Sequence, residues 1–191
     1  MKSDSVAPES TPFDELAGII LENRQGSRVL VAVDGADPDA TRAFADALGA
    51  GLRGRGRAAV RVSIDRLVED TQVADPVDAT SGAALYRRRV DYERVRSEIL
   101  AGFRQRGQLP GDTNVAPEDA VLVVDGAFLL RPELRGSWNV RLWLEGDQTL
   151  SEPEFEARRL YVRDQSPRES ATLMYDVSDP AIPRPVWGDS C

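Results

Sequence analysis

Continuous apolar runs alternate with amphipathic segments along this chain. Runs rich in valine and leucine, the pattern of buried parallel strands, lie at 28–34, 58–65, 120–125, 139–144 and 171–175. Apolar residues at helical spacing fill the intervals 13–23, 38–53 and 91–106, and a short charged helical pattern covers 154–163. The alternation predicts an α/β fold in which a mostly parallel five-stranded sheet lies between two layers of helices.

The remaining segments carry little periodicity. Residues 1–12 are small, polar and proline-bearing, which predicts a disordered leader before a single domain over 13–191. Residues 66–90 have few regularly spaced apolar positions, so we expect an irregular excursion that covers a site. The tail from Asp179 is rich in proline, with Trp187 as its expected anchor.

The composition removes several function classes. The chain has 191 residues, a net charge of −8 and no histidine, which excludes histidine acid–base catalysis and the usual zinc sites. The single cysteine, Cys191, excludes an internal disulfide. The acidic balance argues against nucleic acid and membrane surfaces as main partners, and no apolar run approaches a membrane span. We therefore expect a cytoplasmic protein without a metal site; a homo-oligomer remains open.

The first strand leads into the frame of a phosphate-binding loop. The segment RVLVAVDGADPDATRAF gives a strand, a glycine turn and a helix, the order that P-loop proteins use. Counted from Gly35, the pattern G-x-x-x-x-G-K-[ST] requires glycine, lysine and a hydroxyl residue, where this chain has Ala40, Thr41 and Arg42. The cation that would hold the β- and γ-phosphates is therefore missing from its usual position.

The same residues have an interpretation that needs no ligand. In Asp37-Pro38-Asp39, an aspartate N-cap precedes a proline at the first helical position and an acid in the first turn, a strong start for a helix. The alternative is a loop that still binds nucleotide, with Arg42 as a substitute cation. Arg42 lies one residue late for that role, on a different helical face.

Several fragments in order give the chain a family resemblance. They are VAVDGADPDATRAFADAL, VRVSID, LYRRRVDYERVRSEIL, AVLVVDGAFLLRPELRGSWNVRLWL and RLYVRDQSPRESATLMYDVSDP. In this order and spacing the sequence resembles the uridine kinase and phosphoribulokinase group of P-loop kinases. The resemblance implies a P-loop NTPase-like three-layer αβα fold and an ATP-dependent transfer to a sugar or nucleoside hydroxyl.

The resemblance also implies roles for particular residues. Asp65, at the end of the second strand, matches the base that accepts the proton of the attacking hydroxyl, and Asp125 matches a Walker B-like acid that organises Mg²⁺. Each acid has a structural alternative, a loop cap for Asp65 and the end of a buried strand for Asp125. Tyr86, Arg88 and Tyr92 lie where relatives contact the acceptor, although adjacent arginines are more often a solvated patch.

The largest departure from the family lies after the fourth strand. Relatives carry an arginine-rich lid there, whereas the acidic interval GDQTLSEPEFEA is all that precedes Arg158 and Arg159, the remnant of that lid. Cationic clamps supply much of the rate in phosphoryl transfer. This chain therefore lacks both the cation of the loop and those of the lid.

Two functions follow from these observations. The favoured one is a pseudoenzyme: a protein with the fold of a uridine kinase that has lost ATP-dependent catalysis and acts as a binding, regulatory or structural module. Its partner would be a small nucleoside-like or phosphorylated ligand or a protein, and no cofactor is expected. The alternative is an active nucleoside or sugar kinase that uses Mg·ATP through a deviant loop, with cations from Arg42, Arg158 or Arg159.

Overall fold

A six-stranded sheet in the order β2-β3-β1-β4-β5-β6 organises the protein. The computed structural model describes residues 11–22, 24, 26–64, 81–88, 91–146, 150–179 and 181–186. The strands are β1 (Val29–Asp34), β2 (Ala59–Ser63), β3 (Val121–Gly126), β4 (Val140–Glu145), β5 (Leu173–Asp176) and β6 (Arg184–Val186). Pairing is parallel from β2 to β5, and β6 alone runs antiparallel, beside β5.

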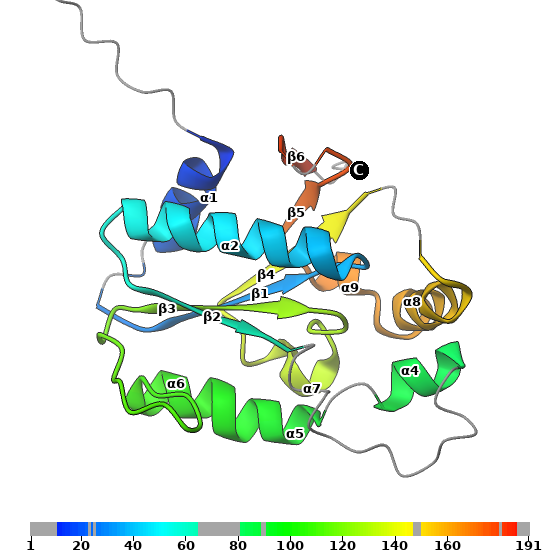
Figure 1. Ribbon diagram of the computed structural model, residues 1–191, viewed down its shortest axis with the longest axis horizontal. Helices are drawn as coiled ribbons and strands as arrows, with labels where there is room; N and C mark the ends of the chain where they lie inside the picture. Colours follow the sequence, from blue (N-terminus) through cyan, green and yellow to red (C-terminus); the bar gives the residue numbers. More distant parts are fainter. Residues whose placement is uncertain are drawn as a thin grey trace, which may run out of the picture.

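Helices cover both faces of this sheet (Figure 1). On one face lie α1 (Pro12–Leu21) and α2 (Pro38–Gly54). On the other, α5 (Tyr92–Arg94), the π-helical turn η1 (Val95–Leu100) and α6 (Ala101–Arg106) form one continuous helical stretch. The remaining helices, which follow the carboxyl ends of strands or connect them, are α4 (Gly82–Arg88), α7 (Pro132–Arg135), α8 (Glu152–Gln165) and α9 (Pro167–Ser170).

Alternation along the central strands divides the core between the two faces. Val31 and Val33 pack with α1 and α2, whereas Leu30 and Ala32 face the helical stretch from Tyr92 to Arg106. All six residues of β1 are buried, as are those of β3, which explains why both strands read as unbroken apolar runs. An acid therefore ends up buried at the carboxyl end of each: Asp34 in β1 and Asp125 in β3.

The three-layer fold and the five expected strands are confirmed, and two local expectations need correction. The sheet has a sixth strand, β6, too short and too proline-rich for a strand signal in the sequence. The stretch 66–90, expected to be irregular, contains helix α4 at Gly82–Arg88. Its residues 66–80 lie outside the described part of the chain, as do residues 1–10 of the expected leader and Trp187 in the tail.

Helix α1 begins one residue earlier than its apolar pattern indicated. Thr11 caps it, and the Asp14 side chain returns a hydrogen bond to the Thr11 backbone, so a capping box fixes the start at Pro12. None of the helices in the described ranges is long and apolar enough to cross a membrane.

Candidate functional site

The loop between β1 and α2 is short and bonded to itself. Three residues separate Asp34, the last of β1, from Pro38, the first of α2. The Asp37 side chain accepts hydrogen bonds from the backbone N–H groups of Asp39 (2.8 Å) and Ala40 (3.1 Å). The predicted N-cap is therefore confirmed. The N–H groups that a phosphate-binding loop turns toward its anion bind a carboxylate of the chain instead.

Thr41 is folded back into the same loop. Its backbone N–H and its hydroxyl both donate to the carbonyl oxygen of Asp37, and the residue is almost fully buried. A Cβ at Gly35 would lie 2.6 Å from the Thr41 hydroxyl oxygen, so glycine is required there by this side chain. The loop glycine thus has an internal packing reason.

Arg42 points along the helix surface. Its Nη1 atom lies 3.1 Å from the Asp39 carboxylate one turn earlier, and this carboxylate is 91% exposed. An exposed ion pair of this kind contributes little to stability. The pair nevertheless holds the guanidinium of Arg42 against an acid of its own helix.

Asp125, the Walker B-like candidate, is paired with a cation that the sequence reading missed. Its Oδ1 atom lies 2.8 Å from Nη2 of Arg61 on the neighbouring strand β2, and Asp125 is only 1% exposed. Arg61 also donates to the Val123 carbonyl (2.9 Å) and to the Asp46 carboxylate of α2 (3.0 Å). The register Arg61↔Val123 brings this pair together, and a single strand read alone does not reveal it.

Two of the predicted residues escape a structural test. Asp65 lies outside the described residues, and so does the side chain of Arg88. The described part of β2 ends at Ser63, whose hydroxyl is buried without a hydrogen-bond partner. Ile64 follows and donates its backbone N–H to the Asp125 carbonyl (2.9 Å).

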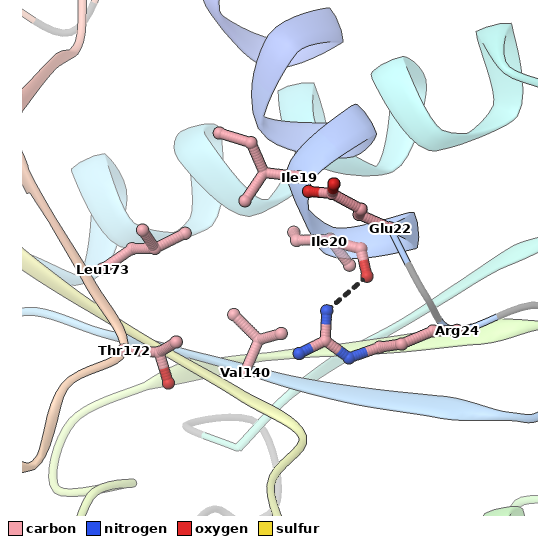
Figure 2. A pocket seen from close by; sticks show the side chains of 7 residues that line it. All are labelled: Ile19, Ile20, Glu22, Arg24, Val140, Thr172 and Leu173. Carbon is pink, nitrogen blue, oxygen red and sulfur yellow. Dashed lines mark hydrogen bonds between the residues drawn. The ribbon is translucent and has the colours of Figure 1, made fainter.

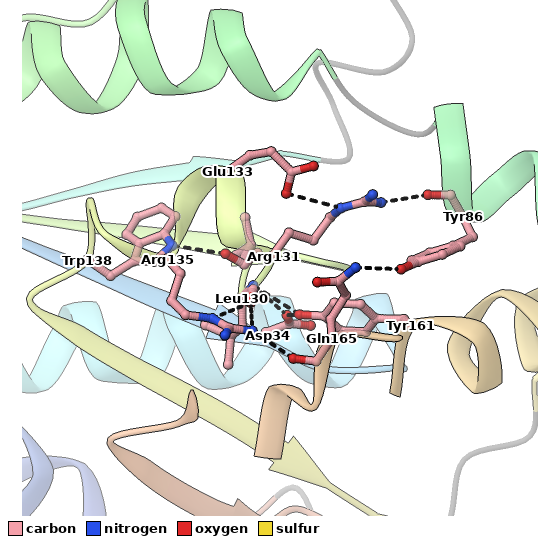
Figure 3. A network of polar contacts seen from close by, with 10 residues as sticks. Asp34, Tyr86, Leu130, Arg131, Glu133, Arg135, Trp138, Tyr161 and Gln165 are labelled. Carbon is pink, nitrogen blue, oxygen red and sulfur yellow. Dashed lines mark hydrogen bonds and ion pairs between the residues drawn. The ribbon is translucent and has the colours of Figure 1, made fainter. Parts of the chain in front are cut away.

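A second buried acid, Asp34, is the centre of a polar network on the opposite face of the sheet (Figure 3). The Tyr161 hydroxyl donates to its Oδ2 atom at 2.6 Å, and the backbone N–H groups of Leu130 (3.0 Å) and Phe128 (3.3 Å) donate as well. Phe128 has φ 66°, a costly conformation for a side-chain-bearing residue. The turn after β3 is thus bent so that two N–H groups face one carboxylate.

Burial dominates the electrostatics of this network. It raises the pKa of Asp34 to about 6, although Arg158 and the hydrogen-bond donors pull that pKa down. Burial and the neighbouring Asp34 carboxylate together raise the pKa of Tyr161. Near neutral pH Tyr161 therefore stays a hydrogen-bond donor to an ionised Asp34.

The two tyrosines predicted on the acceptor side come together around an arginine. The Arg131 guanidinium lies 4.7 Å from the ring centre of Tyr86 and 4.8 Å from that of Tyr92, and it donates to the Tyr86 carbonyl at 2.7 Å. Burial raises the pKa of Tyr92 to about 12. Tyr86 also contacts the rings of Phe128 and Tyr161 and so links this group to the Asp34 network.

The two candidate lid residues separate. Arg158 stacks on the Trp143 ring, 3.8 Å from its centre, with Nη1 at 3.9 Å from Asp34 Oδ1. Arg159 is exposed on the outer side of α8. The predicted residues therefore fall into two groups, Asp125 with the loop on the α2 face and Tyr86, Tyr92 and Arg158 on the other.

The sequence reading missed three residues of this region. Asp34 and Arg61 both carried a weak signal, a charge within or at the end of an apolar strand, whereas Arg131 carried none. Over the described ranges, no three acidic, cysteine or histidine residues gather in a way that could hold a metal ion.

No protein-family model matches the sequence, and no curated protein matches it. Among solved structures, a possible uridine kinase from Bacillus stearothermophilus is similar, with a TM-score of 0.64, 17% identity and coverage of 85% of this chain and 96% of that one. A candidate fructose transport system kinase from Silicibacter sp. TM1040 has a TM-score of 0.55, 20% identity and coverage of 84% and 95%. Identities this low show the fold alone, the three-layer α/β fold of P-loop kinases.

Proposed function

We propose that this protein keeps the fold of a P-loop kinase as a binding module and does not transfer phosphoryl groups from ATP. The observation that carries the proposal is the Asp37 carboxylate, which accepts the N–H groups of Asp39 and Ala40 at the start of α2. An anion is already bound where a phosphate would have to lie, and it belongs to the chain. A second anion would meet repulsion there instead of attraction.

The loop length supports the same conclusion. With α2 beginning at Pro38, only three residues lie between strand and helix, and Pro38 has no N–H to donate. Thr41 stands where the resemblance requires lysine, and its hydroxyl is occupied by the Asp37 carbonyl. Neither a cradle of N–H groups nor the point charge of a lysine is available to the terminal phosphates.

The metal side of such a site is also closed. Mg²⁺ requires oxygen ligands that carry negative charge and keep room for water. The described oxygen of Asp125 that would serve is bonded to the Arg61 guanidinium at 2.8 Å, and Asp125 is buried. We infer that the residues do not fit Mg·ATP, with the cation of Arg61 in place of a metal ion.

The acceptor side offers better binding chemistry. Arg131 between the rings of Tyr86 and Tyr92 combines aromatic faces with a fixed positive charge, and Arg158 on Trp143 repeats the arrangement. Aromatic faces stack on planar bases, and guanidinium groups bind phosphate and carboxylate groups. A small nucleoside-like or phosphorylated ligand suits these groups, and a protein partner is the other candidate.

The test is a phosphotransfer assay. Uridine, cytidine and simple sugars are incubated with Mg·ATP labelled at the γ-phosphate, using the protein and an Asp125→Asn variant. We expect transfer no faster than the enzyme-free background for both proteins. Turnover that Asp125→Asn abolishes would overturn the proposal.

An active kinase is the second candidate. The similarity to two proteins described as kinases, over 96% and 95% of their lengths, favours it. In that case the loop would have to open and release Asp37 from the start of α2. Micromolar affinity for Mg·ATP would favour this candidate, since the closed loop leaves no basis for it.

A further inference from the structure

Two adjoining cavities run between α1 and the edge of the sheet. They have volumes of about 360 and about 330 Å³, and Ile19, Thr172 and Leu173 line both of them. Figure 2 shows the first, with Ile19 and Ile20 of α1 facing Val140 and Leu173. We call the joined space the α1–β5 groove. It lies at the amino ends of β4 and β5, away from the loops that follow β1 and β3.

The groove has apolar walls that remain open to solvent. Ile19 is 46% exposed although it lies between the two cavities. The second cavity adds Tyr175 and Pro185 to the lining, so it extends beneath the β5–β6 pair. Exposed isoleucine over an unfilled apolar cavity indicates that a further apolar group belongs there.

The register of the last two strands identifies that group. Antiparallel pairing places Asp176 opposite Arg184, Tyr175 opposite Pro185 and Met174 opposite Val186. Continuing the same register by one residue places position 187 opposite Leu173 and position 188 opposite Thr172. Those two residues of β5 line both cavities.

The face of the sheet is fixed by the same pairing. Residues directly opposite each other on antiparallel strands project to the same face. Leu173 and Tyr175 pack with the cluster of α1 and α2, so a residue opposite Leu173 faces α1. Position 187 is tryptophan, the largest apolar side chain, in a tail otherwise made of small and polar residues.

We propose that the α1–β5 groove receives residues 187–191 of this chain, with the indole of Trp187 between Ile19 and Leu173. The tail extends β6 and clamps α1 to the edge of the sheet. The indole N–H requires an acceptor when buried, and Glu15, which lines the second cavity, brings a carboxylate to its rim. A second copy of the chain carries the same tail and is the competing occupant.

Tryptophan fluorescence tests this assignment. Trp138 and Trp143 are 5% and 3% exposed, so the signal of Trp187 is isolated by subtracting the spectrum of a Trp187→Phe variant. We expect a blue-shifted difference emission and iodide quenching several-fold weaker than that of free tryptophan, both independent of protein concentration. A red-shifted, freely quenched Trp187 would overturn the proposal.

Matched variants locate the docking site. Ile19→Asp places a charge in the groove at a half-exposed position that the core tolerates, and Val115→Asp does the same at a position 61% exposed and outside both cavities. Ile19→Asp should expose Trp187 to iodide, and Val115→Asp should not. Equal quenching in both variants contradicts the assignment, and so does shielding that appears only as dimers form, which gives the groove to a second copy.

Discussion

The guanidinium of Arg61 lies 2.8 Å from the carboxylate of Asp125, across neighbouring strands and nearly out of contact with water. This pair occupies the end of β3, where the family resemblance had implied an acid that organises a metal ion. Because Asp125 is buried, its charge requires a partner. Arg61 satisfies it within the protein.

Removing Arg61 should therefore destabilise the fold strongly. We expect Arg61→Met to lower the free energy of unfolding by about 3 to 5 kcal/mol, because Asp125 is left charged and unpaired in the core. Urea denaturation measures the loss. In the double variant Arg61→Met with Asp125→Asn, the buried charge is gone, and much of that stability should return.

The matched control for this prediction is an exposed pair. Arg96 lies 2.7 Å from Glu93 on the surface, and Arg96→Met should change the free energy of unfolding by less than about 1 kcal/mol. If Arg61→Met behaves like Arg96→Met, the buried pair does not stabilise Asp125.

The helix cap leads to a second prediction. Asp37→Ala removes the acceptor of two N–H groups at the start of α2 and should cost about 1 kcal/mol in unfolding free energy. Asp39→Ala is the control, since its carboxylate is 91% exposed and pairs with Arg42 alone among the ion partners described. Equal midpoints for Asp37→Ala and the unsubstituted protein in urea would refute the capping account.

Asp34 should make stability depend on pH. Its pKa is about 6 in the fold against an ordinary 3.8, so the folded state binds more protons than the unfolded state between these values. The free energy of unfolding therefore falls as pH rises through this window, by up to about 3 kcal/mol. The contribution is complete below the ordinary pKa and lost above about pH 6.

The measurement for Asp34 is a difference between two proteins. Other carboxylates have lowered pKa values, Asp14 and Asp176 among them, and they give the opposite slope. Urea denaturation from about pH 4 to about pH 7, compared between the protein and Asp34→Asn, isolates the Asp34 contribution. Parallel pH profiles for the two would contradict the raised pKa.

Much of the fold was readable in the sequence because buried parallel strands leave unbroken apolar runs. The runs at 120–125 and 139–144 match β3 and β4 within a residue or two at each end. The cap at Asp37 was also readable, since the acceptor and its N–H donors lie within three residues. β6 was missed because its three residues include a proline and carry no periodicity.

The site was harder to predict because its contacts join distant segments. Tyr161 meets Asp34 across 127 positions of sequence, and Arg61 meets Asp125 across 64. Strand register and helix packing decide such contacts, and neither is visible in local composition. The resemblance placed Tyr86 and Tyr92 near an acceptor site, yet Arg131 between them had no local signal.

Rebuilding the family's loop is a further test. Ala40→Gly with Thr41→Lys restores the glycine and lysine of the pattern, but Asp37 still holds the N–H groups at the start of α2. We expect no calorimetric binding of Mg·ATP by this double variant. Adding Asp37→Gly should release those N–H groups and give measurable affinity, and binding by the double variant alone would show that the cap does not close the loop.

The most direct test of the central claim, that the β1–α2 loop is closed to phosphate, is the melting temperature of the unsubstituted protein in millimolar Mg·ATP. A ligand at about 100 times its dissociation constant adds about 2.7 kcal/mol of stability, which is several degrees for a domain of this size. We predict no shift beyond that produced by the same concentration of MgCl₂ with sodium sulfate. A rise of several degrees specific to Mg·ATP would contradict the account.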